Sequence, residues 1–216
     1  MKNIMMTIMV GLFLIGTACS AKAAVLLPGA LFVAPSGAVA PAGTFVTSLV
    51  DNFTGTDINN TVYFTGTLDE AVLTNSTGML FEYSFINNSS SIDAITQLAT
   101  LGYSNYSVNA DALSAGILPG SPSVNGMDRS AGAGDVVTFG WIANPVNPGQ
   151  SSGSFWIQTD APTYQAATTQ LIGGGIATMA TDGPAGLPAA TPEPASMALL
   201  GMGFIGLIGL KRPRSV

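Results

Sequence analysis

The chain has no histidine, one cysteine and few charged side chains, which make up 8% of its 216 residues. Without histidine, the usual general base near neutral pH is missing, and Ser-His-Asp and Cys-His catalytic arrangements are excluded. Zinc and copper also lose their commonest nitrogen ligand. The only cysteine, Cys19, has no partner for an internal disulfide. We therefore expect no enzyme activity and no cofactor, with calcium the only metal that the side chains favour.

Positive charge is almost absent from the middle of the chain. Arg129 is the only cation between residues 24 and 190, against eleven acidic residues, so this stretch carries a formal charge of −10. Such a surface repels nucleic acid and anionic lipids. Carboxylates are the only catalytic groups left, which keeps a surface hydrolase open as an alternative. Asp69 and Glu70 are adjacent, but neighbours on a strand point to opposite faces and would make a poor acid/base pair.

Residues 1–23 have the composition of a secretory signal peptide. A basic Lys2 precedes an apolar stretch at residues 5–15, and small residues follow at Ala21 and Ala23. This pattern predicts export through the Sec translocon and cleavage after Ala23. A lipoprotein signal with Cys19 as the acylated residue is the alternative, but Gly16 stands where that signal has a branched apolar residue.

The C-terminal 26 residues combine a proline-rich motif, an apolar segment and a basic end. Pro192, Glu193, Pro194 and Ala195 end a linker over residues 186–194, and residues 195–210 are apolar. As a helix this segment would span about 24 Å at ~1.5 Å per residue, less than the roughly 30 Å core of a bilayer. Residues 211–216 form a basic cytoplasmic tail, by the positive-inside bias. Its cations are Lys211, Arg212 and Arg214.

This tail resembles the PEP-CTERM sorting signal of Gram-negative bacteria. The resemblance implies an exported protein that stays in the inner membrane until an exosortase processes it at the motif, and that then reaches the cell surface or the extracellular matrix. It also implies an association with exopolysaccharide and biofilm. A plain membrane anchor behind a proline-rich linker is the alternative reading of the same residues.

Residues 24–185 are predicted to form a single antiparallel β-sandwich, jelly-roll-like, because short runs alternate between apolar and polar residues with turn clusters between them. One or two helical turns are expected at residues 92–98. The strands are expected at residues 44–50, 61–67, 79–86, 106–110, 136–142, 154–159 and 175–179. The inward-facing residues are predicted to be Phe81, Tyr83, Phe85, Val137, Phe139, Phe155 and Ile157.

Two kinds of ligand site are conceivable in this domain. Calcium prefers oxygen ligands, and Asp51 with Asp57, or Asp128 with Asp135, are candidates to bind it in acidic loops. Trp156 and Tyr63 are candidates for an aromatic platform under a sugar ring. A carbohydrate-binding module, with or without calcium, is therefore the main alternative to a purely structural matrix protein.

Overall fold

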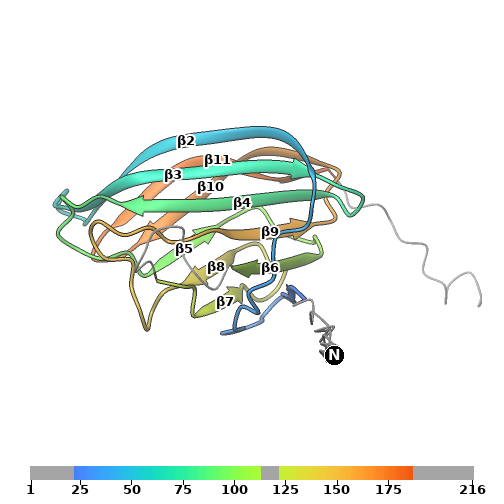
Figure 1. Ribbon diagram of the computed structural model, residues 1–216, viewed down its shortest axis with the longest axis horizontal. Coiled ribbons are helices and arrows are strands. Elements are labelled where there is room, and N and C mark those ends of the chain that lie inside the picture. Colours follow the sequence, from blue (N-terminus) through green and yellow to red (C-terminus); the bar gives the residue numbers. More distant parts are fainter. Residues whose placement is uncertain (1–21, 113–121, 187–216) are drawn as a thin grey trace, which may run out of the picture.

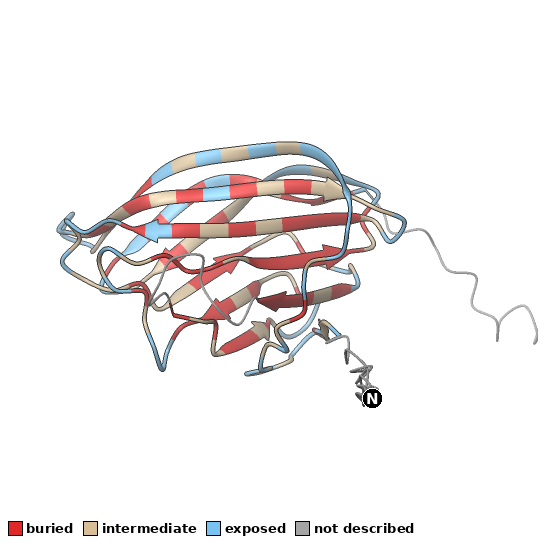
Figure 2. Ribbon diagram, in the orientation of Figure 1, coloured by how far each residue is buried: buried red, intermediate tan, exposed pale blue. Residues whose placement is uncertain are grey.

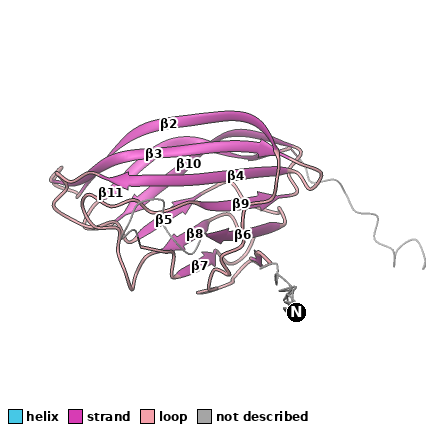
Figure 3. Cartoon of the chain, viewed as in Figure 1, coloured by secondary structure: helices cyan, strands magenta, loops and turns pink. Residues whose placement is uncertain are grey.

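The computed structural model describes residues 22–112 and 122–186, in which every regular element is a strand (Figure 3). No helix in these residues is long and apolar enough to cross a membrane. The expected signal peptide up to residue 21, the membrane segment and the basic tail lie outside the described residues. The strands are β1 (Ala24–Val25), β2 (Thr44–Thr56), β3 (Val62–Thr74), β4 (Met79–Asn87), β5 (Gln97–Thr100), β6 (Val108–Ala112), β7 (Gly126–Arg129), β8 (Val137–Gly140), β9 (Phe155–Thr159), β10 (Thr163–Ile172) and β11 (Ile176–Ala185).

All eleven strands belong to one antiparallel sheet in the order β1-β6-β9-β4-β3-β2-β11-β10-β5-β8-β7. The predicted all-β, antiparallel fold is confirmed. Two separate sheets would make a simple sandwich, but here β2 and β11 join the two halves through one residue pair, Thr56 with Ile176. The sheet curls at this seam, so that β2, β3 and β4 lie in front of β10 and β11 in Figure 1. The jelly-roll connectivity remains a prediction.

The core lies between the inner faces of the two halves. All seven residues predicted to face inward are buried, six of them completely and Tyr83 to within 2%. Aromatic rings cross from one half to the other: the Phe139 and Phe155 centroids are 4.6 Å apart, and those of Phe85 and Trp141 are 5.2 Å apart. Each large ring removes much apolar area from water, so this cluster contributes most to the stability of the domain.

The prediction of a helical turn at residues 92–98 is wrong. Ile95 and Leu98 have helical spacing, but Ile95 forms an isolated bridge with Val146 and Leu98 lies in β5 opposite Phe139. Both side chains are fully buried, so tertiary packing overrides the local pattern. Strands β1, β5, β7 and β10 were also not anticipated. Strand β10 has mostly small and polar residues and is identified by its full-length pairing with β11.

Residues 24–43, which we call the N-terminal strap, link the two free edges of the curled sheet. The strap pairs with β6 through β1, and Val33 then forms a bridge with Met127 in β7. It continues over the outer face of β9, where Trp156 Nε1 donates a hydrogen bond of 3.1 Å to the Ala38 carbonyl. Figure 2 shows the result: β9 is buried along its length, whereas β2 keeps an exposed outer face.

Candidate functional site

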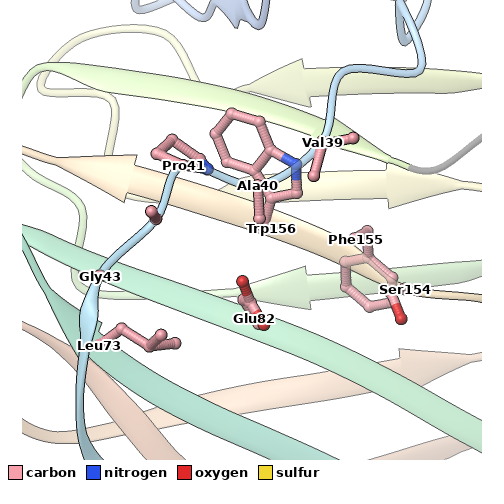
Figure 4. A pocket seen from close by; sticks show the side chains of 10 residues that line it. Val39, Ala40, Pro41, Gly43, Leu73, Glu82, Ser154, Phe155 and Trp156 are labelled. Atoms are coloured by element: carbon pink, nitrogen blue, oxygen red, sulfur yellow. The ribbon is translucent and has the colours of Figure 1, made fainter.

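A groove of about 420 Å³ opens on the outer face of the sheet, between the strap and strands β3, β4 and β9 (Figure 4). Strand alternation places Glu82 on the face opposite Phe81 and Tyr83, and Glu82 is in register with Trp156 on β9. The lining combines one carboxylate with a hydroxyl and several apolar groups. It consists of Val39, Ala40, Pro41, Ala42, Gly43, Leu73, Glu82, Ser154, Phe155 and Trp156.

A second hollow of about 280 Å³ extends the groove toward β2. It shares Glu82 and Ser154 with the first and adds Ser48, Asp69 and Ser84. Asp69 is opposite Ser84 in the β3–β4 ladder, so it is a diagonal neighbour of Glu82, with Cβ atoms roughly 7–8 Å apart. The two hollows therefore form one elongated groove with two carboxylates.

Burial raises the pKa of the half-buried Glu82 carboxyl, because the site removes part of its water. Within the described part of the chain, no hydrogen bond reaches the side chain of Glu82 or of Ser154. A partly desolvated carboxylate with free acceptor capacity favours a ligand that brings hydrogen-bond donors. The groove contains no cation, so a neutral hydroxyl-rich ligand or a cationic one fits it, and an anion does not.

Trp156 and Tyr63 do not form a sugar platform together. Trp156 is only 2% exposed because the strap covers its ring. Trp156 is in register with Glu82 on β4, and Glu82 is in register with Ala71 on β3. Ala71 and Tyr63 are eight residues apart on β3, which is about 26 Å at ~3.3 Å per residue. Trp156 instead fixes the strap and thereby shapes one wall of the groove.

Three of the four aspartates considered for calcium already hold parts of the chain together. Asp57 accepts hydrogen bonds of 2.8 Å from the backbone N–H groups of Asn59 and Thr61, which hold the β2–β3 turn. Asp128 accepts one from the Phe32 N–H in the strap, and Asp135 accepts one of 2.6 Å from the Ser104 hydroxyl. Asp51 lies in mid-strand, where it pairs with Leu68.

Asp51 and Asp57 are not brought together as a ligand set. Asp51 is separated from the turn at Asp57 by the extended end of β2, about 17 Å at ~3.3 Å per residue. Among the described residues, no group of three or more acidic, histidine or cysteine side chains is placed to hold a metal ion. Calcium binding therefore remains a prediction without a geometric site.

Asp69 and Glu70 face opposite sides of β3, as predicted. Glu70 points inward and is 2% exposed. Its Oε2 accepts a hydrogen bond of 2.9 Å from the Asp182 N–H, whereas its Oε1 has no partner in the described structure. The alternation of Leu68, Glu70 and Val72 would have revealed this buried acid from the sequence, since the two flanking side chains are core residues.

Arg129 holds the strap from inside the domain. It is 3% exposed and donates hydrogen bonds to the carbonyls of Leu26, Gly134 and Tyr103, each of 2.9 Å, and to that of Tyr106, of 2.8 Å. The only cation of a strongly acidic domain would be expected on the surface, close to the acidic side chains, but Arg129 is buried. Here the guanidinium replaces backbone pairing where three irregular segments meet.

The residues proposed for sorting, Pro192, Glu193, Pro194 and Ala195, lie outside the described residues, as do Lys211, Arg212, Arg214, Ala21 and Cys19. The family comparison matches residues 190–213 to the PEP-CTERM protein-sorting motif. This motif implies an exported protein that is anchored in the membrane and then processed. The chain therefore carries a match to this sorting motif, and the motif implies an exosortase as the processing partner.

Comparison with curated proteins and with solved structures found no match to the chain. The sorting motif therefore bears on the export and processing of the protein, and only the groove and the core bear on the role of its β domain.

Proposed function

We propose that this protein is a non-enzymatic surface or matrix protein of a Gram-negative bacterium. The signal peptide at residues 1–23 directs it through the Sec translocon, and residues 195–210 hold it in the inner membrane. An exosortase then cleaves at the PEP motif and releases it to the cell surface or medium. The match to the sorting motif over residues 190–213 is the observation that carries this proposal.

The residues of the tail suit a temporary anchor. Pro192 and Pro194 fix their φ angles and lack an N–H, so no helix or central strand continues through them. A segment that resists regular structure in this way suits cleavage by a membrane-embedded protease. The apolar segment is short for a bilayer, and Lys211, Arg212 and Arg214 keep its end in the cytoplasm.

Fractionation in a host with an exosortase tests the sorting function. The wild-type chain should lose its tail and appear outside the inner membrane. Glu193→Ala should remain full length and membrane-bound, and Ser215→Ala, a control beyond the motif match, should behave like wild type. A chain without residues 197–216 should leave the membrane without an exosortase. Full-length wild-type protein that stays in the inner membrane would refute the proposal.

A second candidate function is binding of a neutral, hydroxyl-rich polysaccharide in the outer groove. Glu82, Asp69, Ser84 and Ser154 offer acceptors to sugar hydroxyls, and the apolar wall of Val39, Pro41 and Leu73 suits the C–H faces of sugar rings. The groove is elongated, which favours a chain over a single sugar. This function would account for an association with exopolysaccharide and biofilm.

A glycan array with neutral, anionic and amino sugars tests the groove. Neutral glycans should bind, and Glu82→Gln should weaken that binding about tenfold, because a hydrogen bond to a charged acceptor is worth about 1.5–3 kcal/mol. Asp51→Asn removes the same charge on the inner face and should have no such effect. Binding of anionic glycans alone, or equal losses in both variants, would contradict the site.

The pair of carboxylates in the groove makes the hydrolase alternative testable with the same samples. A glycosidase needs two carboxyl groups on either side of a glycosidic bond. We expect bound glycans to be recovered intact after long incubation. Release of reducing ends that is lost in both Asp69→Asn and Glu82→Gln would show catalysis instead of binding.

A further inference from the structure

The seam between the two halves of the sheet has little backbone pairing. β2 and β11 share only the pair Thr56–Ile176, and β11 then continues to Ala185 without a further register partner on β2. Its other edge is paired with β10 along its full length. Backbone groups on the seam side of β11 therefore need partners from elsewhere.

Glu70 supplies such a partner from across the seam. It belongs to β3, on the far side of β2, yet its Oε2 lies 2.9 Å from the Asp182 N–H of β11. The Tyr83 hydroxyl lies beside it, 3.4 Å from the Asp182 carbonyl and 3.3 Å from the Tyr103 hydroxyl. The second carboxyl oxygen of Glu70 and the buried Thr100 hydroxyl have no hydrogen-bond partner in the described structure.

Asp182 lies close to the point where the β domain meets the tail. Three residues follow it in β11, and the Tyr106 hydroxyl then donates a hydrogen bond to the Gly186 carbonyl. The match to the sorting motif begins at residue 190. The Glu70 and Tyr106 contacts therefore fix the last strand immediately before the segment that is processed.

The surroundings of Glu70 disfavour its charge. Burial raises the pKa of Glu70 to about 7, and the negative Asp182 adds to the rise, while the hydrogen bond from the Asp182 N–H opposes it. The titratable groups around it are Tyr83 on β4, Tyr103 after β5, Asp182 on β11 and Asp51, which shares the inner face of β2. Apart from Arg129, which is bound to backbone carbonyls, the described domain from residue 24 offers no cation that could pair with the charged form.

We propose that Glu70 is a proton-controlled latch on the last strand of the domain. The protonated carboxyl accepts the Asp182 N–H, directs its own proton to a neighbouring hydroxyl and holds β11 across the seam. The ionised carboxylate leaves a buried charge with one oxygen unpaired, and the end of β11 opens to hydrate it. Opening releases the end of β11, a few residues before the match to the sorting motif.

Hydrogen exchange on the full-length chain in detergent micelles tests this latch. After correction for the intrinsic exchange rate, the opening constant of amides at residues 181–185 should rise about tenfold between pH 6 and pH 8, if Glu70 regains its ordinary pKa when the strand opens. Glu70→Gln keeps an acceptor for the Asp182 N–H and cannot ionise. Its opening constant should be the same at both pH values.

Two further variants separate the latch from general effects. Asp69→Asn removes an acid from the neighbouring position on the outer face of β3, and it should retain the tenfold rise of the wild type. Glu70→Leu removes the acceptor, and its β11 amides should be weakly protected at both pH values. A pH-dependent rise in Glu70→Gln, or a flat wild-type profile, would overturn the proposal.

Discussion

Strands β9 and β2 belong to the same half of the sheet, yet only β9 is enclosed on every side. β9 pairs with β4 and β6 along both edges, and all five of its residues are buried. β2 pairs fully with β3 only, and its outer residues Ser48, Val50, Asn52 and Thr54 are all exposed. The N-terminal strap accounts for much of this difference, because it covers the outer face of β9 and leaves that of β2 open. The enclosure of β9 therefore depends on the N-terminal strap, most of which is not regular strand.

The largest expected effect is on the inner face of β9. Phe155 is fully buried and its ring contacts those of Tyr83, Phe85, Phe139 and Trp141. Phe155→Ala should lower the free energy of unfolding by about 3–5 kcal/mol. Phe45→Ala in β2, where the ring is 62% exposed, should change it by less than about 0.5 kcal/mol. Urea unfolding measures both, and equal losses would remove the contrast between the two strands.

The strap provides the second test, through Arg129. Arg129→Met leaves several buried carbonyls without a donor, and we expect a loss of about 3 kcal/mol, since such losses are not additive. The strap should become sensitive to protease, and Trp156 emission should shift to the red as the outer face of β9 opens. Arg129→Lys keeps a donor and should have a smaller effect. A strap that remains protected in Arg129→Met would show that Trp156 and β1 alone hold it.

Much of the aromatic core between the two halves could be predicted from the sequence. The alternation of Phe81, Tyr83 and Phe85, and of Val137 and Phe139, identifies β4 and β8 and their inner faces correctly. The strap could not be predicted, because its alanine, proline and glycine residues have no periodicity and its pairing depends on distant edges. The groove was missed for the same reason, since the strap forms one wall. The sorting motif, in contrast, is a linear signal and needs no fold to be identified.

The seam beside β2 gives the third test, in the pH dependence of stability. The pKa of Glu70 is about 7 in the folded domain and has an ordinary value of 4.5. Its contribution is therefore fully present below pH 4.5 and is lost as the pH rises through 7. The wild type should lose about 2 kcal/mol between pH 5 and pH 8 relative to Glu70→Gln. Urea unfolding at the two pH values measures the difference, and parallel profiles would place the titration elsewhere.

The smallest expected effect is that of calcium on the melting temperature of the domain. The domain carries many acids against Arg129 alone, so any cation should relieve some repulsion and raise the melting temperature slightly. Asp51 and Asp57 are separated along β2, and Asp128 and Asp135 are bonded to different segments, so we expect calcium and magnesium to act equally at matched ionic strength. Asp57→Asn would weaken the β2–β3 turn in both ions alike, because its carboxylate accepts two backbone N–H groups there. A calcium-specific, saturable rise in the melting temperature that disappears in Asp57→Asn or Asp135→Asn would contradict this expectation. It would show that calcium assembles a site from residues that are apart in the free domain and stabilises the native state by mass action.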